Sequence, residues 1–276
     1  HQDVVDMPWE DVPTDVLLKE KQCWEMRKGA SWHGYQHTEN GYAMVDPCKL
    51  ELVTPGFDRK TGKYLDWGIP ASVLAQFLRE RGIVPEKNDL NTILFLVTPG
   101  IETSKAGTLI SALVSFKRLF DRNASLAEVL PDFTRAHKEH YADTGVRDLC
   151  IDMHQFYRDH DCSGLQKNQF RAEHFPEIAM PPREAIQKFI ANEVDYLPLD
   201  QLDGRVAATL NLVYPPGIAV VVPGERYTER CKPMTDYFRM FEESYARFPG
   251  FGNEINGVYQ EEVDGEIKLF TYVVKE

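Results

Sequence analysis

The sequence predicts an α/β unit followed by an α+β region, and three observations carry this prediction. A strand, a helix, a strand and a helix follow one another between residues 50 and 121. Residues 126–160 then carry two helical patterns, and "MPPREAIQKFIAN" is helical as well. Short apolar runs bounded by glycine and proline return after residue 210, around one further helix. Alternating strands and helices favour packed α/β layers, whereas segregated ones favour the α+β class. We therefore divide the chain into residues 1–124 and 125–276.

The α/β unit opens with a short strand and an amphipathic helix. "KLELVTPG" is an apolar run that Pro55 and Gly56 end, and the turn-rich "DRKTGKY" follows it. Helices often begin at proline and end at glycine. In "IPASVLAQFLRERG" Pro70 and Gly82 occupy these places, and the apolar face comprises Val73, Leu74, Phe77 and Leu78.

A second strand and helix complete this unit. "TILFLV" is apolar throughout, which predicts a strand covered on both faces. "SKAGTLISALVSFKRLFD" places Leu109, Leu113, Phe116 and Phe120 on one helical face. The unit therefore ends near Asp121. The preceding residues 1–49 predict loops and short helices, with Trp9, Trp24 and Trp32 as large apolar anchors.

The second region predicts helices first and strands later. Residues 126–160 contain two helical patterns, and in "VRDLCIDMHQFYRDH" the apolar positions, with Met153 as core filler, are Val146, Leu149, Cys150, Met153 and Phe156. "MPPREAIQKFIAN" and "PMTDYFRMFEESYARFPG" also predict helices. "YPPGIAVVVPGE" predicts a buried strand at residues 218–222, and the chain ends in a hairpin that turns at Asp264-Gly265.

The composition is that of a soluble globular chain. The 276 residues are 43% hydrophobic and 27% charged. No apolar stretch approaches the roughly 20 residues that span a bilayer, and no signal-peptide pattern opens the chain, so we expect a cytoplasmic protein. The formal charge of -12 disfavours nucleic acid and membrane as partners, and it is compatible with a cationic small molecule or with solubility alone. The start at His1, without methionine, suggests a fragment or a processed product.

The sequence lacks the motifs of several common metal, phosphate-binding and nucleophile sites. The five cysteines form no CxxC pair, and neither His33 with His37 nor His137 with His140 has acidic ligands placed as in a zincin motif. No metal site is therefore expected. No phosphate-binding glycine loop and no GxSxG elbow occur, and Lys105 of "TSKAG" opens a helix where it is expected to be solvated.

Four segments resemble the C-terminal part of the bacterial ornithine/lysine/arginine decarboxylases, which are fold-type I pyridoxal-phosphate enzymes. These are "DPCKLELVTPG", "GIPASVLAQFLRERGIVPEKNDLNTILFLVTPG", "GRVAATLNLVYPPGIAVVVPGE" and "FPGF". "VPEKNDLN", "MHQFYRDH" and "LQKNQFRAEHFPE" look most like the ornithine-specific members, particularly the inducible form. Lysine-specific members share the Glu-Lys pair, so the lysine alternative is the nearer one, whereas arginine enzymes depart from it.

The resemblance implies decarboxylation of ornithine to putrescine and CO₂, in polyamine biosynthesis, with pyridoxal phosphate as the cofactor. It also implies that residues 1–124 are the small domain and 125–276 the C-terminal domain, without the large domain that binds the cofactor. The family's lysine lies in a Ser-x-His-Lys segment, and the only look-alike here is "TRAHK", which ends at Lys138. Its charged surroundings indicate a solvated helix rather than a site for a Schiff base. No catalytic and no cofactor-binding residue is therefore expected, and the chain alone is expected to be inactive.

Partners follow from the resemblance too. It implies ornithine as the substrate and a homo-oligomer that is at least a dimer, while a nucleotide effector such as GTP stays open. A non-catalytic assembly or regulatory module is the alternative from another class of function. The "WHGY" segment from Trp32 to Tyr35 serves either packing or a site.

Glu86 is the one candidate substrate-binding residue. It follows Gly82, where a helix ends, and precedes the apolar strand that begins near Ile93, so rigid elements on both sides hold it. Taken alone, Glu86 and Lys87 would read as an exposed turn with little energetic effect. The resemblance implies instead that Glu86 contacts the distal amine of the substrate.

Overall fold

The computed structural model describes residues 11–30, 33, 35–214 and 217–275. The chain divides into two compact units, His1–Leu50 with Phe95–Ile101 and Glu51–Leu94 with Glu102–Glu276. In the first unit, α2 (Thr14–Lys19) and the 3₁₀ helix η2 (Lys21–Cys23) confirm the expected short helix and loop. The indole N–H of Trp24 donates to the Leu17 carbonyl at 2.8 Å. The predicted anchors Trp9 and Trp32 lie outside the described residues.

A three-stranded sheet in the order β1-β5-β4 runs through residues 49–96. Its strands are β1 (Lys49–Val53), β4 (Lys87–Asn88) and β5 (Thr92–Leu96), and β4 pairs antiparallel with β5. The predicted burial of residues 92–97 on both faces is wrong at one end, since Leu96 and Val97 are 45% and 40% exposed. The strand leaves the core of the second unit there and enters the segment Phe95–Ile101 of the first. The loop "DRKTGKY" contains an unpredicted hairpin, β2 (Phe57–Asp58) with β3 (Lys63–Tyr64).

Two predicted helices follow the sequence pattern. In α3 (Ala71–Arg79), Val73, Phe77 and Leu78 are fully buried, and Pro70 precedes the first turn. Gly82 has a φ of +75°, a conformation that glycine adopts without strain, and the chain leaves the helix there. In α4 (Thr103–Asp121), the ring of Phe116 lies edge-to-face with that of Phe77, with 5.0 Å between centroids.

Of the two helical patterns predicted in residues 126–160, the later one forms a single helix, whereas the earlier one forms three short helices. The helix α8 (Val146–Asp159) buries all five predicted apolar positions, Met153 among them. The first pattern instead forms α5 (Leu126–Val129), α6 (Pro131–Ala136) and α7 (Lys138–Tyr141). Pro131 lacks the N–H that would continue α5, so the helix restarts at this residue. The helix α9 (Cys162–Asn168) and the 3₁₀ helix η3 (Ala172–His174) follow.

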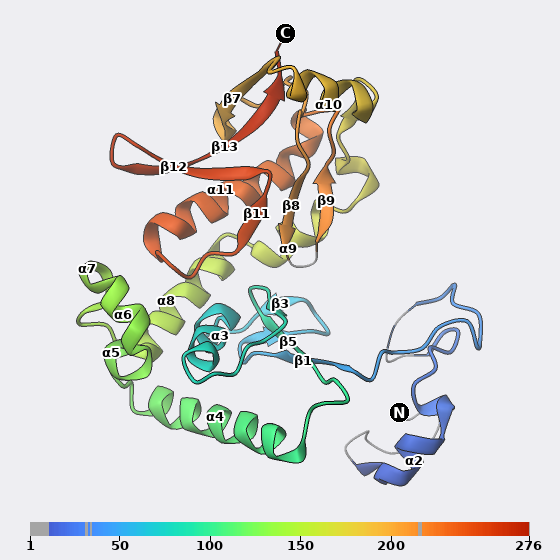
Figure 1. The fold of residues 1–276 in the computed structure, drawn as a ribbon, viewed down its shortest axis with the longest axis vertical. Helices are drawn as coiled ribbons and strands as arrows, with labels where there is room; N and C mark the ends of the chain where they lie inside the picture. Colours follow the sequence, from blue (N-terminus) through green and yellow to red (C-terminus); the bar gives the residue numbers. More distant parts are fainter. Residues whose placement is uncertain (1–10, 31–32, 34, 215–216, 276) are drawn as a thin grey trace. The chain divides into compact units, whose positions relative to one another are not determined.

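The C-terminal strands form three small sheets beside α11 (Lys232–Arg247), which contacts β13 and α9 (Figure 1). Their orders are β12-β13-β7, β11-β8-β9 and β10-β6. The strands are β6 (Glu177–Ile178), β7 (Val194–Pro198), β8 (Asn211–Tyr214), β9 (Ile218–Val221), β10 (Glu225–Arg226), β11 (Glu254–Asn256), β12 (Val258–Val263) and β13 (Glu266–Val274). The helix predicted in "MPPREAIQKFIAN" is α10 (Pro182–Ile190). Two 3₁₀ helices, η4 (Leu199–Gln201) and η5 (Glu229–Cys231), also lie in this region.

The hairpin is confirmed, whereas the strand at residues 218–222 is buried only in part. Val263 pairs with Glu266 across Asp264-Gly265, and both turn residues have positive φ, as a type I′ turn requires. The strand β9 lies at the edge of its sheet, which leaves Ile218 55% exposed while Val221 is buried. Pro215 and Pro216 of "YPPG" lie outside the described residues.

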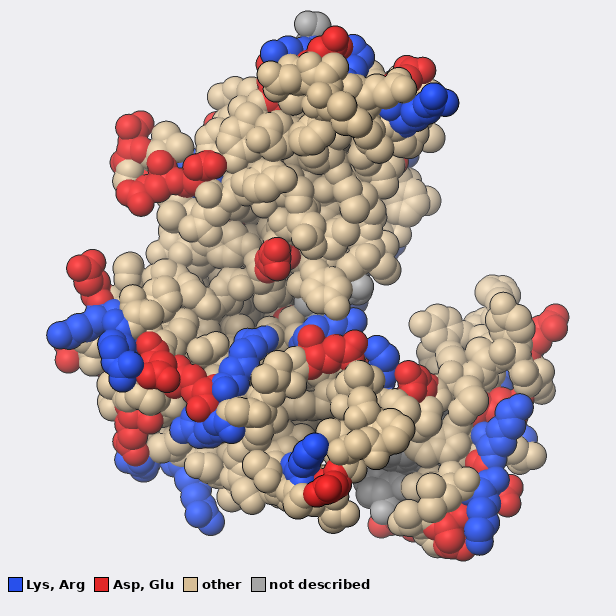
Figure 2. Space-filling model, in the orientation of Figure 1, with Lys and Arg blue, Asp and Glu red and all other residues tan. Residues whose placement is uncertain are grey.

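Charged side chains are unevenly spread over the face shown in Figure 2. Acidic residues gather at the tip of the β12–β13 hairpin, while much of the surface over the C-terminal strands is uncharged (Figure 2). Among the described residues, no helix combines the length and the apolar character needed to cross a membrane.

Candidate functional site

Glu86 lies immediately before β4, with its backbone fixed to the central strand of the small sheet. Its N–H donates to the Leu94 carbonyl at 2.8 Å, while the side chain is exposed. Pro85 before it is buried, and Lys87 after it pairs with Leu94 in the β4–β5 ladder. The backbone is thus held on both sides, as the sequence predicts for a residue between a helix end and a strand.

Glu86 lines a pocket of about 220 Å³. Four segments of the second unit form its wall: α3, the strand β4, the end of β8 and the loop that leads into β11. The lining residues are Ser72, Gln76, Arg79, Glu86, Lys87, Asn88, Tyr214, Gly250, Phe251, Gly252, Asn253 and Glu254. Two family-like segments, "VPEK" and "FPGF", therefore meet here although they are far apart in the sequence.

The pocket contains both signs of charge. The Arg79 guanidinium donates to the Asn88 side-chain oxygen at 3.0 Å, and burial lowers the pKa of Arg79. The Lys87 ammonium lies 5.8 Å from the centroid of the Tyr214 ring, within the range of a cation–π contact. Glu254 adds a second carboxylate to the lining. The pocket thus offers a ligand two carboxylates, Glu86 and Glu254, and two cationic side chains, Arg79 and Lys87.

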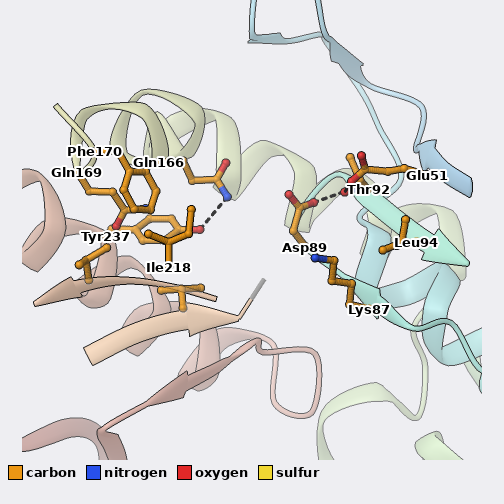
Figure 3. A pocket seen from close by; sticks show the side chains of 12 residues that line it. Glu51, Lys87, Asp89, Thr92, Leu94, Gln166, Gln169, Phe170, Ile218 and Tyr237 are labelled. Carbon is orange, nitrogen blue, oxygen red and sulfur yellow. Dashed lines mark hydrogen bonds between the residues drawn. The ribbon is translucent and has the colours of Figure 1, made fainter. Parts of the chain in front are cut away.

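A second cavity, of about 230 Å³, lies next to the same sheet (Figure 3). Lys87 and Asp89 line it, as do Glu51, Thr92, Leu94, Gln166, Gln169, Phe170, Val213, Ile218, Val220 and Tyr237. The Asp89 carboxylate accepts hydrogen bonds from the backbone N–H groups of Asn91 and Thr92, both at 2.7 Å. Burial raises the pKa of this carboxyl group.

The sequence reasoning missed this cavity. From the sequence alone, no role is assigned to Asp89, Gln169 or Tyr237. One signal was available, because Asp89 directly follows β4 (Lys87–Asn88) and stands two residues after Lys87, a spacing that places two side chains on the same side of an extended segment. The partners of Asp89 across the cavity come from residues about 80 to 150 positions later, which no local pattern connects to it.

Other candidate residues are dispersed. Lys138 is exposed on the four-residue helix α7, and Lys105 is exposed in the first turn of α4. The His137 ring packs on Phe133 with 4.7 Å between centroids, and the rings of His33 and Tyr35 stack at 5.7 Å. Trp32 and Gly34 of the "WHGY" segment lie outside the described residues. Within the described part of the chain, no three histidine, cysteine or acidic side chains come together as metal ligands would.

The residues present do not fit a pyridoxal phosphate site. A Schiff-base lysine requires surroundings that desolvate its amine. Lys138 is exposed, and its neighbours on α7 are Glu139 and His140, which are exposed as well. Lys138 therefore lacks the surroundings that this cofactor needs at its attachment point.

Two family models match the chain. Residues 9–105 match the major domain of the Orn/Lys/Arg decarboxylases, and residues 163–275 match the C-terminal domain of the same enzymes. The inducible ornithine decarboxylase of Escherichia coli K12 is 44% identical over 97% of this chain and 36% of its own length. The lysine decarboxylase LdcA of Pseudomonas aeruginosa is 38% identical over 87% of this chain and 31% of its own length.

Solved structures agree with these matches. The constitutive lysine decarboxylase of E. coli superposes with a TM-score of 0.82 at 35% identity, over 94% of this chain and 36% of that one. Lysine decarboxylase A from P. aeruginosa superposes with a TM-score of 0.84 at 36% identity, over 92% and 33%. The chain thus spans about a third of the length of the relatives that it matches. By sequence and by fold, it belongs to the Orn/Lys/Arg decarboxylase family.

Proposed function

We propose that this chain forms part of an ornithine decarboxylase and that Glu86 binds the distal ammonium group of ornithine. The observation that carries the proposal is the pocket in which Glu86 and Glu254 line one concave surface together with Tyr214. The similarity to ornithine decarboxylases, at 44% and 41% identity for the two E. coli enzymes, supports ornithine as the substrate.

The role of Glu86 follows from the energy of desolvation. An ammonium group that leaves water loses solvation that only an opposite charge or several hydrogen bonds can replace. Glu86 offers a carboxylate on a backbone that is hydrogen-bonded to β5, so the backbone loses little conformational entropy when the side chain binds. The family depends on pyridoxal phosphate, which supplies the electron sink for decarboxylation. In the intact enzyme this chain would hold the far end of the substrate in place.

Several features of the intact enzyme belong to the same proposal. Residues 1–124 correspond to a small α/β domain and residues 125–276 to the C-terminal α+β domain, and the enzyme is a cytoplasmic homo-oligomer, at least a dimer. Putrescine and CO₂ are the products. Because the described residues do not fit the cofactor, the 276-residue chain incubated with pyridoxal phosphate and ornithine is expected to release no CO₂. Turnover by this chain would contradict the domain assignment.

Lysine is the second candidate substrate. Lysine decarboxylases match the chain at 37–38% identity, and two superpose with TM-scores above 0.8. Ornithine is one methylene shorter than lysine, so the ratio of kcat/KM values for the two amino acids separates the candidates. A role as an assembly module without a substrate predicts no effect of Glu86 on either value.

The experiment replaces Glu86 by Gln in the intact enzyme, which keeps the side chain's shape and removes its charge. The value of kcat/KM for ornithine should fall about 30-fold or more. This expectation rests on the general cost of removing one partner of a buried charge pair, which is roughly 2–5 kcal/mol. Glu102→Gln is the matched control, since Glu102 is exposed at the start of α4 and should leave kcat/KM unchanged. A folded Glu86→Gln enzyme with normal kcat/KM would show that Glu86 is a surface turn.

A further inference from the structure

The cavity beside Asp89 has polar side chains on two sides and several apolar side chains in its lining. Figure 3 shows Asp89, Glu51 and Thr92 on one side and Gln166, Gln169, Phe170 and Tyr237 on the other. The side chains of Leu94, Val213, Ile218 and Val220 supply apolar lining. A volume of about 230 Å³ admits a small organic molecule, and Glu86 does not line this cavity.

Among the described residues, the two carboxylates at the acidic end, Asp89 and Glu51, form no salt bridge within 4.0 Å. Asp89 and Glu51 are linked through Thr92, which donates its backbone N–H to Asp89 at 2.7 Å and its hydroxyl to Glu51 at 2.9 Å. Lys87 lines the cavity as well, and its ammonium lies 5.8 Å from the centroid of the Tyr214 ring. A carboxylate that is partly removed from water without a cation favours the approach of one.

The opposite end contains an unsatisfied acceptor. Gln169 is only 5% exposed, and among the described residues its Oε1 has no hydrogen-bond partner. Nearby, the Gln166 side chain donates to the Tyr237 hydroxyl at 2.9 Å. A buried carbonyl oxygen without a donor is costly, and a ligand that donates a hydrogen bond removes that cost. This observation is independent of the carboxylates across the cavity.

We propose that this cavity binds a short aliphatic amine with a hydrogen-bond donor at its far end, such as a diamine. The first ammonium group lies between Asp89 and Glu51, the alkyl chain crosses the apolar lining, and the second donor reaches the Gln169 amide. The apolar side chains in the lining exclude a hydrated metal ion as the best occupant. An anion is disfavoured because the lining holds two carboxylates and a single lysine.

The test is calorimetric titration of the 276-residue chain with 1,4-diaminobutane, 1-butylamine and 1-butanol. The diamine should bind more tightly than the monoamine, and the alcohol should not bind. Asp89→Asn should weaken binding of the diamine about tenfold, because a hydrogen bond to a charged group is lost. Gln169→Leu keeps the size of the side chain and removes its amide oxygen. The affinity for the diamine should therefore fall to that for butylamine. Glu102→Gln serves as the exposed control and should bind as the unaltered chain does.

Five results would overturn the proposal, four of them in the titrations of the cavity itself. These are no binding of the diamine by a folded chain, unchanged binding by Asp89→Asn, equal binding of butanol, and displacement of the diamine by Mg²⁺ in an Asp89-dependent way. Loss of binding in Glu86→Gln but not in Asp89→Asn would also overturn it, and would place the amine at Glu86. That last result supports the proposed function, so the two proposals can fail separately. Circular dichroism of each variant establishes that it is folded.

Discussion

His154 lies in a space that only glycine leaves open. A Cβ atom built on Gly56 would stand 2.7 Å from His154 Cε1, and one built on Gly68 would overlap the imidazole ring and lie 2.8 Å from the Pro55 carbonyl oxygen. The ring is held by its Nε2, 2.8 Å from the Leu65 carbonyl oxygen. Because a carbonyl can only accept, Nε2 carries the proton. Two glycines and one histidine thus join the segment before α3 to α8.

Replacing Gly68 by Ala should destabilise the fold. The methyl group would force the His154 ring or the backbone at Pro55 to move, and overpacking of this kind costs about 1–3 kcal/mol. Urea unfolding followed by circular dichroism measures the change. Gly107→Ala is the matched control, since Gly107 lies inside α4 with nothing within 4 Å of its Cβ position. That variant should gain about 0.5–1 kcal/mol, and equal effects at both sites would refute the packing argument.

The titration of His154 makes stability depend on pH. Burial lowers the pKa of His154, and the charge of Arg158 adds to this effect. In the unfolded chain a histidine titrates near about 6.5, so the unfolded state takes up a proton first as the pH falls. The contribution of His154 to the free energy of unfolding is therefore present above the pKa of the unfolded state, about 6.5, and is lost as the pH falls toward the lowered pKa of the folded state.

His154→Gln keeps a donor for the Leu65 carbonyl and does not titrate. The free energy of unfolding of the unaltered chain minus that of the variant should decrease between pH 7.5 and pH 5. Other titrating groups are common to both proteins and cancel in this difference. A difference that stays constant over the same pH range would show that the folded state leaves the pKa of His154 unshifted.

The sequence could indicate single site residues but not their partners. The position of Glu86 between a helix end and a strand was predictable, and its backbone does pair with β5, whereas its choice as a site residue came from the family resemblance. The cavity beside Asp89 was not predictable. Gln169 and Tyr237 line it only because α9, α11 and the β1-β5-β4 sheet come together in the fold. The substrate role of Glu86 remains a prediction, as does the amine site.

At the scale of elements, patterns with a clear apolar stripe were predicted well. The residues Val73, Phe77 and Leu78 of α3 and the five apolar positions of α8 are buried as their spacing indicates. Strand burial was predicted less well, because Ile218 and Leu96 lie at an edge or at a strand end that an apolar run does not reveal. The break at Pro131 shows that a single proline outweighs helical spacing in a short segment.

The β12–β13 hairpin depends on its turn. Gly265 has a φ of +82°, so Gly265→Ala should cost roughly 1–2 kcal/mol through left-handed strain alone, because nothing lies within 4 Å of its Cβ position. Asp264→Gly is the complementary variant, since Asp264 already adopts a φ of +54° and should tolerate glycine with little change. Thermal unfolding of both variants compares them. A harmless alanine at 265 would indicate that the turn is not of type I′.

At the scale of the whole molecule, the chain provides two parts of a larger enzyme family. Matches to the major and C-terminal domain models lie at its two ends, and the matched relatives are about three times as long. The uncharged surface over the C-terminal strands and the acidic hairpin tip are displayed on the same face of Figure 2. The family was predictable from the motifs, because "YPPG", "VPEK" and "FPGF" are specific segments rather than general patterns.

The central claim is that the Glu86 carboxylate contacts the distal ammonium group of ornithine. A double-substitution cycle in the intact enzyme isolates this contact, with Glu86→Gln as one change and norvaline, which lacks the δ-amine of ornithine, as the other. Glu86→Gln should lower kcat/KM for ornithine about 30-fold or more and leave kcat/KM for norvaline almost unchanged, since norvaline has no charge for Glu86 to meet. An equal loss for both substrates, or no loss for either, would contradict the claim.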